Sequence, residues 1–331
     1  MSTAQTLTPT GSGRAAHPAA VITNGLIRAT IYLPDADCGF YRSTRFDWSG
    51  MIGSLECAGH QFYGPWFTKS EDGVCDFIYR DADIVAGAQS SALGPAEEFP
   101  VPQGFADATA GGTFVKIGVG VLRKPDDAAY SQYSPYEVVD TGRWSVETAD
   151  DAVTFVQEVS DPRSGYGYIY RKTVRLASGR PELVIAHRLQ NTGRLPIETT
   201  QYNHNFLTSG GATTGPAFRI VLPFTIQTSH PPDASLAAIE GNVITYARNL
   251  VDREGVSFPI EGLGATASDY DVRVENTQTG AAVRIRSDQP MVRALLWSIR
   301  SVISFEPFVD TTTQPGTGTE WTSTYTYYSV R

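Results

Sequence analysis

The sequence predicts an all-β protein with one large domain. Short apolar or alternating runs recur along the chain, broken by Gly, Pro, Asn and Asp. Several of these runs lie about 8–12 residues apart, a spacing typical of an all-β sandwich or barrel. Helical periodicity is scarce, with short candidates near residues 233–240 and 287–291. The chain has 331 residues, 18% of them charged, which is an ordinary globular composition with room for a large core.

The first half of the chain contains the clearest strand patterns. Residues 21–33 predict two strands around Asn24-Gly25, a dipeptide favoured in tight hairpin turns. Residues 113–122 predict a strand whose glycines allow another backbone to approach closely. Further strands are expected at 136–139, 144–147, 153–159, 165–176, 182–189 and 197–207.

The second half continues in the same style. Strands are expected at 218–226, 243–246, 270–275, 281–285, 292–297, 302–308 and 321–330. No linker divides the two halves, so residues 19–331 are expected to form a single domain. Residues 1–18, rich in Ser, Thr, Gly, Ala and Pro, are expected to form a flexible tail. Residues 71–110 and 310–320 read as long loops, which are often functional in compact domains.

Composition and charge exclude several classes of function. The net charge is −9, and Lys and Arg are scattered, so no nucleic-acid partner is expected. No run of about 20 apolar residues is present, so no membrane partner is expected. The cysteines are Cys38, Cys57 and Cys75, an odd number without metal-ligand spacing, and we interpret them as reduced thiols of a cytoplasmic protein. No histidine pair has the spacing of a metal site, and no phosphate loop or dinucleotide fingerprint occurs.

Two distant segments each place one titratable side chain among apolar neighbours at the end of a predicted strand. His204 lies in residues 201–207, and Glu306 lies between Phe305 and Pro307. A histidine and a partly desolvated glutamate in one cleft could act as an acid/base pair. The alternatives are a core histidine satisfied by backbone groups and a glutamate paired with Arg293 or Arg300.

Polar residues around these segments suggest a binding cleft. Asn203 and Asn205 flank His204 and should share the opposite face of the strand, while Tyr202 lies beside them. Such a density of polar groups within a strand often faces a ligand, because buried polar groups need partners. Glu97 and Glu98 are interpreted as a solvated acidic turn, with a second acidic contribution to the site from a loop as the alternative.

A third segment combines aromatic rings with charged donors and acceptors, a combination that suits sugar rings and hydroxyls. The alternative is an aromatic core with solvated charges. The candidate binding residues of this segment are Arg42, Arg45, Asp47, Trp66 and Lys69.

Together these pieces resemble the galactose mutarotase-like superfamily of aldose 1-epimerases. Asn203-His204-Asn205-Phe206 is similar to the family's Asn-His motif, and Glu306-Pro307 is similar to its glutamate segment. Gln314-Pro315-Gly316 before an aromatic last strand matches the family's ending. The resemblance spans residues 20–331 and implies a large antiparallel β-supersandwich that binds a monosaccharide or small glycan. The family's first histidine, in an Asn-x-x-His-Gly-Gly-like segment, has no clear match here.

The resemblance implies an aldose 1-epimerase-like enzyme with His204 as the acid and Glu306 as the base, and with Arg45 or Arg42 orienting hydroxyls. Such a proton shuttle uses no metal or organic cofactor. The missing first histidine leaves open a non-catalytic carbohydrate-binding domain. A lyase or glycoside-cleaving enzyme, with His204 and Tyr202 performing elimination, is a third possibility. The sequence does not define the sugar, the anomer or the oligomeric state.

Overall fold

The computed structural model describes residues 17–330 as an almost purely β protein. Its helical elements in that range are two short 3₁₀ turns, Ser209–Gly211 and Ala267–Asp269. The predicted tail, residues 1–18, lies outside the described residues apart from His17 and Pro18. These two contact the body of the protein: His17 Nδ1 lies 2.8 Å from the Cys38 carbonyl, and Leu33 N–H donates to the Pro18 carbonyl. No helix among the described residues has the length and hydropathy needed to cross a membrane.

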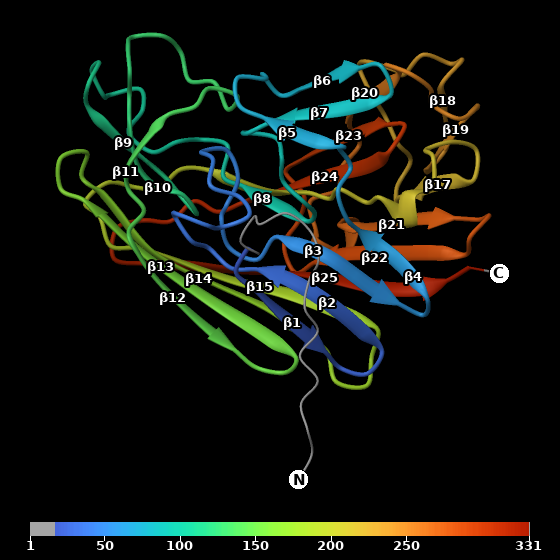
Figure 1. The fold of residues 1–331 in the computed structure, drawn as a ribbon, viewed down its shortest axis with the longest axis horizontal. Helices are drawn as coiled ribbons and strands as arrows, with labels where there is room; N and C mark the ends of the chain where they lie inside the picture. Colours follow the sequence, from blue (N-terminus) through green and yellow to red (C-terminus); the bar gives the residue numbers. More distant parts are fainter. Residues whose placement is uncertain (1–16, 331) are drawn as a thin grey trace, which may run out of the picture.

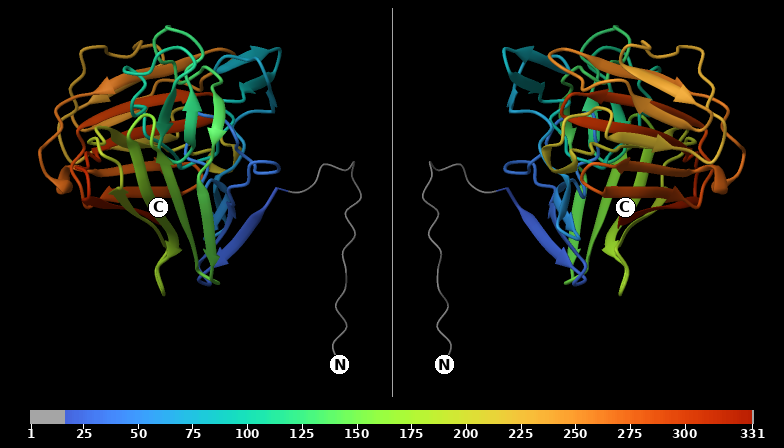
Figure 2. Two further views of the ribbon diagram at one scale, coloured as in Figure 1. Left: turned by 90° about the vertical axis from the view of Figure 1, so that its left-hand side faces the viewer. Right: turned by 90° about the vertical axis from the view of Figure 1, so that its right-hand side faces the viewer.

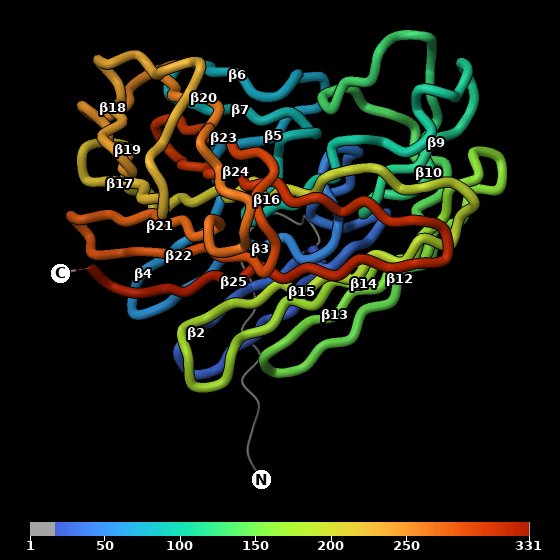
Figure 3. Tube along the Cα trace, turned by 180° about the vertical axis from the view of Figure 1, so that it is seen from behind, coloured from blue at the N-terminus to red at the C-terminus, as the bar shows by residue number. Residues whose placement is uncertain are grey.

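The largest sheet has ten antiparallel strands in the order β12-β13-β14-β15-β25-β22-β21-β17-β19-β18. The last of its strands in the sequence, β25, lies near the centre of the sheet, between β15 and β22 (Figures 1 and 3). The strands are β12 (Arg143–Thr148), β13 (Ala152–Asp161), β14 (Tyr166–Leu176), β15 (Glu182–Asn191), β17 (Phe218–Val221), β18 (Ala237–Glu240), β19 (Val243–Tyr246), β21 (Asp271–Asn276), β22 (Ala281–Ser287) and β25 (Gly318–Ser329).

A five-stranded antiparallel sheet, in the order β20-β23-β24-β16-β8, packs against this layer. Its strands are β8 (Ala96–Glu98), β16 (Thr200–His204), β20 (Gly255–Ile260), β23 (Arg293–Ile299) and β24 (Val302–Asp310). The packing is visible in two contacts: Trp321 Nε1 of β25 donates to Gln201 Oε1 of β16 at 3.1 Å, and Asn203 Nδ2 donates to the Tyr325 hydroxyl at 2.6 Å. Alternate residues of β25 are buried, as expected when one face of a strand forms the core.

Three smaller sheets complete the fold. The N-terminal sheet contains β1 (Ala19–Thr23), β2 (Ile27–Tyr32), β3 (Ile52–Cys57) and β4 (His60–Tyr63). It lies beside the green strands of the ten-stranded sheet in the side views of Figure 2. Thr23 N–H donates to the Asp150 carbonyl between the two sheets. The others contain β9 (Thr113–Lys116), β10 (Gly120–Arg123) and β11 (Glu137–Asp140), and β5 (Lys69–Glu71), β6 (Phe77–Arg80) and β7 (Asp83–Gly87).

The structure confirms the all-β prediction and the hairpin at Asn24-Gly25, and it corrects several local ones. Residues 237–240 form β18, and residues 287–291 contain no helix, so both helical predictions were wrong. The region 71–110, predicted as a loop, contains β6, β7 and β8. These strands are short, and β8 has the sequence Ala-Glu-Glu, so they lack the apolar alternation by which longer strands are recognised.

Candidate functional site

Strands β16 and β24 bring His204 and Glu306 together. Tyr202 lies opposite Phe308 in this antiparallel pair. His204 comes two residues later on β16 and Glu306 two residues earlier on β24, so the same register places His204 opposite Glu306. His204 Nε2 lies 3.2 Å from Glu306 Oε1, and the two side chains are 8% and 9% exposed. Side chains two residues apart share a face of a strand, so Tyr202 and Phe308 accompany the pair on the face that points away from the ten-stranded sheet.

The pair opens onto a cavity of about 230 Å³ on this face of the five-stranded sheet. Drug-sized ligands usually occupy roughly 300–1,000 Å³, so a smaller molecule, of the size of a single sugar ring, suits this space. Besides His204 and Glu306, the lining residues include Arg45, Trp66, Tyr202, Arg293, Trp297 and Phe308.

Burial moves the pKa values of the two titratable groups toward each other's usual range. The pKa of His204 falls well below 6.5, because burial disfavours the imidazolium and the Arg45 charge adds to this effect. Burial raises the pKa of Glu306 to about 8; Arg45 opposes this rise, and Glu98 adds to it. At neutral pH the proton of the pair therefore rests on Glu306, and His204 is neutral. This is the reverse of the resting protonation that the sequence-based mechanism assumed.

Aromatic side chains form one wall of the cavity. The His204 ring stacks on Phe206 with a centroid distance of 3.7 Å, and Phe206 stacks on Trp66 at 5.4 Å. Trp297 meets the His204 ring edge-on at 5.3 Å. Trp66 is fixed by its indole N–H, which donates to the Ala92 carbonyl at 3.1 Å. Aromatic faces of this kind can stack against the C–H face of a sugar ring.

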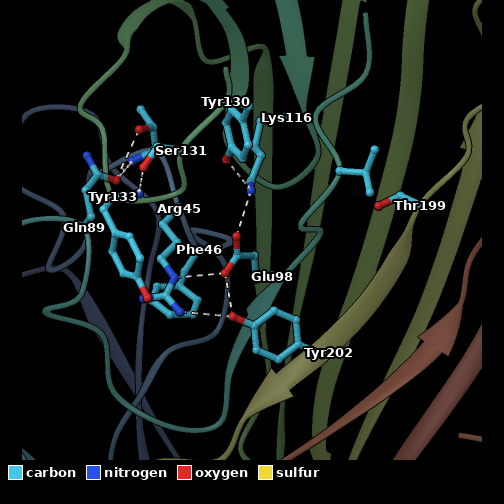
Figure 4. Close-up of polar contacts among 12 residues, drawn as sticks. Arg45, Phe46, Gln89, Glu98, Lys116, Tyr130, Ser131, Tyr133, Thr199 and Tyr202 are labelled. Carbon is cyan, nitrogen blue, oxygen red and sulfur yellow. Dashed lines mark hydrogen bonds and ion pairs between the residues drawn. The ribbon is translucent and has the colours of Figure 1, made fainter. Parts of the chain in front are cut away.

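Arg45 also lines the cavity and is held by buried partners (Figure 4). Its Nε donates to Glu98 Oε2 at 3.0 Å, and its Nη2 donates to the Tyr202 hydroxyl at 3.2 Å. The guanidinium lies 4.5 Å from the Phe46 ring centroid and 5.0 Å from that of Tyr133. Ion pairing and cation–π contacts therefore fix one orientation of this side chain.

The structure does not place all of the predicted binding residues at the cavity. Arg42 is exposed and donates to the Asp37 carbonyl. Lys69 is exposed and pairs with Glu71 at 3.0 Å. Neither residue lines the cavity, because each is exposed and bonds to a neighbour in its own surface segment.

Asn203 and Asn205 are buried on the face of β16 opposite to His204, as the alternation predicts. Asn203 Nδ2 donates to the Tyr325 hydroxyl, which in turn donates to Asn205 Oδ1 at 2.9 Å. Their polar groups therefore join the two sheets and do not line the cavity. Asp47 is also buried and pairs with Lys172 at 3.2 Å.

Glu97 and Glu98, predicted as a solvated acidic turn, are 1% and 0% exposed, so that prediction was wrong. On β8 the two side chains point to opposite faces. Glu98 joins Arg45, and Glu97 Oε2 contacts Lys172 Nζ at 3.0 Å in a second cluster. His187 Nε2 lies 3.0 Å from Glu97 Oε1 in the same cluster. Burial alone would raise the pKa of Glu97, but the charges of His187 and Lys172 outweigh it and hold the pKa at about 2.

Sequence reasoning also missed Lys116, which is fully buried and lies 3.0 Å from Glu98 Oε1. A lysine inside the apolar run 113–122 was an available signal, because a buried ammonium needs a carboxylate partner. Arg300, an alternative partner for Glu306, instead donates to the carbonyls of Ala82 and Asp252. Within residues 17–330, no cluster of three or more His, Cys, Asp or Glu side chains is arranged to hold a metal ion.

Comparison with solved structures supports the fold assignment. The Slr1438 protein from Synechocystis sp. PCC 6803 has a TM-score of 0.55 at 9% identity, covering 98% of this chain and 100% of its own. A galactose mutarotase-like protein from Clostridium acetobutylicum has a TM-score of 0.53 at 10% identity, covering 94% and 95%. The GalM/aldose epimerase homologue from C. elegans has a TM-score of 0.52 at 12% identity, covering 96% and 100%.

No protein-family model matches the chain, and no curated protein sequence does either. The structural likeness extends over nearly the whole chain, and its low sequence identity means that it defines the fold alone. This chain has the galactose mutarotase-like fold, a large antiparallel β-sandwich.

Proposed function

We propose that this protein is an aldose 1-epimerase-like enzyme that interconverts the anomers of a monosaccharide, with His204 and Glu306 exchanging the protons. The observation that carries the proposal is the 3.2 Å contact between these two buried groups in a cavity the size of one sugar ring. The shared fold with mutarotase-like proteins supports it by analogy only.

The chemistry needs one base and one acid at the same pH. In the resting pair, the proton on Glu306 can pass to His204 Nε2, which gives a carboxylate and an imidazolium without changing the number of protons. Glu306 then takes the proton of the C1 hydroxyl while the C1 carbonyl forms and the bond from C1 to the ring oxygen breaks. His204 gives its proton to the ring oxygen. Rotation about the C1–C2 bond and reversal of these steps yield the other anomer.

The remaining cavity residues would position the sugar. Arg45 presents donors from a fixed guanidinium, and Trp297 offers an aromatic face beside His204. The lyase alternative is less well supported, because it requires Tyr202 to lose its proton. Burial and the adjacent Glu98 carboxylate raise the pKa of Tyr202 well above 10, and its hydroxyl already donates to Glu98 at 2.6 Å.

Proton NMR exchange spectroscopy on a panel of aldoses tests the proposal directly. The wild-type protein should accelerate exchange between the anomers of at least one sugar over the rate without protein. Glu306→Gln should abolish this acceleration with the fold intact, and Glu320→Gln, which changes an exposed carboxylate in a surface ion pair, should retain it.

Full acceleration by Glu306→Gln would refute the assignment of Glu306. Line broadening of a sugar without accelerated exchange would identify the protein as a carbohydrate-binding domain, the alternative that the missing first histidine suggests.

A further inference from the structure

Glu98 is fully buried and yet holds three hydrogen-bond donors (Figure 4). Its Oε2 accepts from Arg45 Nε at 3.0 Å and from the Tyr202 hydroxyl at 2.6 Å. Its Oε1 accepts from Lys116 Nζ at 3.0 Å. Arg45 and Tyr202 line the cavity, whereas Glu98 and Lys116 lie behind them.

We propose that Glu98 is a positioning residue for this cavity: one buried carboxylate fixes the guanidinium of Arg45 and the phenol of Tyr202 in the wall and balances the positive charge that Arg45 brings to the His204–Glu306 pair. This inference rests on the proposed function of that pair and adds a residue that does not itself touch the sugar.

The geometry argues for positioning because both wall residues depend on the same oxygen. Tyr202 donates to Glu98 and accepts from Arg45 Nη2 at 3.2 Å, so the three groups form a closed triangle. Arg45 Nη1 donates to Ser90 Oγ at 3.3 Å and lies 3.8 Å from Asp76 Oδ1, and both of these residues line the cavity. Without the carboxylate, the guanidinium would lose its only partner at Nε in this triangle, and the phenol would lose its acceptor. Charge-assisted hydrogen bonds of this kind are the strong ones in proteins.

The charge balance argues for a second effect, on Glu306. The charged groups that act on Glu306 are Arg45 from the segment before β3, Arg293 from β23, and Glu98 from β8, while His204 faces it from β16. Both arginines lower the pKa of Glu306, and Glu98 raises it. Removing the Glu98 charge leaves only the partly exposed Asp76, 3.8 Å from Arg45 Nη1, to balance Arg45, so the proton on Glu306 should be released at lower pH.

The experiment compares Glu98→Gln with Glu97→Gln, an adjacent and chemically identical change on the opposite face of β8. The rate of anomer exchange should fall at high pH when the pair loses its shared proton, near pH 8 in the wild type. In Glu98→Gln this limb should move to lower pH by about one unit, the order of a single nearby charge, and KM should rise. In Glu97→Gln both should stay at their wild-type values, because Glu97 belongs to the cluster of Lys172 and His187.

Two further variants separate the effects and protect the test against misfolding. Glu98→Gln combined with Lys116→Met removes both members of a buried ion pair, which proteins often tolerate, and should show a smaller shift in the same direction. Tyr202→Phe keeps every charge, so it should raise KM without moving the limb.

A folded Glu98→Gln protein, or the folded double variant, with the wild-type limb and KM would overturn the proposal. If the wild type accelerates no sugar, the proposed function fails, but this inference is still tested by following the Glu306 carboxyl carbon by NMR during a pH titration. The same downward shift supports it, and an unchanged titration overturns it.

Discussion

Replacing Glu306 with Gln should stabilise the protein while it abolishes turnover, and the gain should grow with pH. Burial raises the pKa of this carboxyl to about 8, against its ordinary value of 4.5. Between these two values the folded protein holds a proton that the unfolded chain has released. The free energy of unfolding of the wild type therefore falls as the pH rises from 4.5 to 8. The stability that the bound proton contributes is complete only below pH 4.5 and is lost above pH 8.

The two pKa values set the size of the effect. Their difference, at 1.36 kcal/mol for each pH unit, gives an upper limit of about 5 kcal/mol at pH 8 and above. Glutamine has nearly the same shape and stays neutral at every pH, so Glu306→Gln avoids this loss. Near pH 4 the carboxyl is protonated in the folded state and largely in the unfolded chain, so the variant and the wild type should then have similar stability.

Urea denaturation at pH 4, 5, 6, 7, 8 and 9 measures this difference directly. The curves of unfolding free energy against pH should be close together at pH 4 and separate steadily toward pH 8. Glu320→Gln is the matched control, because its carboxylate is 68% exposed and should leave the curve parallel to that of the wild type. A Glu306→Gln curve parallel to the wild type over the whole range would refute the argument that burial holds the proton on Glu306.

Two other predictions follow from the buried charges. Lys172→Met should lower the free energy of unfolding by about 3–5 kcal/mol, because it leaves the carboxylates of Glu97 and Asp47 buried without their shared cation. Lys69→Met removes an exposed ion pair and should cost little in the same urea experiment. Equal costs for the two variants would contradict this view of the cluster. Arg293→Gln should move the high-pH limb of anomer exchange upward, opposite to Glu98→Gln, because the Arg293 charge lowers the pKa of Glu306; a downward shift would contradict the charge balance.

Alternation along a strand explains why part of the site could be predicted from the sequence. Asn203 and Asn205 do lie on the face of β16 opposite to His204. The meeting of His204 with Glu306 could be suspected from the residue types, but it depends on the register between β16 and β24, which are about 100 residues apart in the chain. The resemblance to a known family, rather than local periodicity, suggested that these two residues act as one acid/base pair, and it did not predict the register.

The charge clusters show what the sequence could not provide. Glu97 and Glu98 look like solvent-exposed residues, because acidic side chains are rarely buried without partners. Their partners, Lys172 and Lys116, come from β14 and β9 and reach them only in the folded protein. The resting protonation of His204 and Glu306 was likewise hidden, since it depends on how deeply the assembled sheets bury the pair.

The position of β25 in the ten-stranded sheet has a consequence for synthesis on the ribosome. This strand follows every other strand in sequence, yet it joins β15, from the first part of the sheet, to β22, from the second. The strands on either side can pair locally as they emerge, but the continuous sheet requires residues 318–329. The nascent chain should therefore carry two unjoined half-sheets with open edges until residues 318–329 have left the ribosome, and these edges are the surfaces that a chaperone would need to cover.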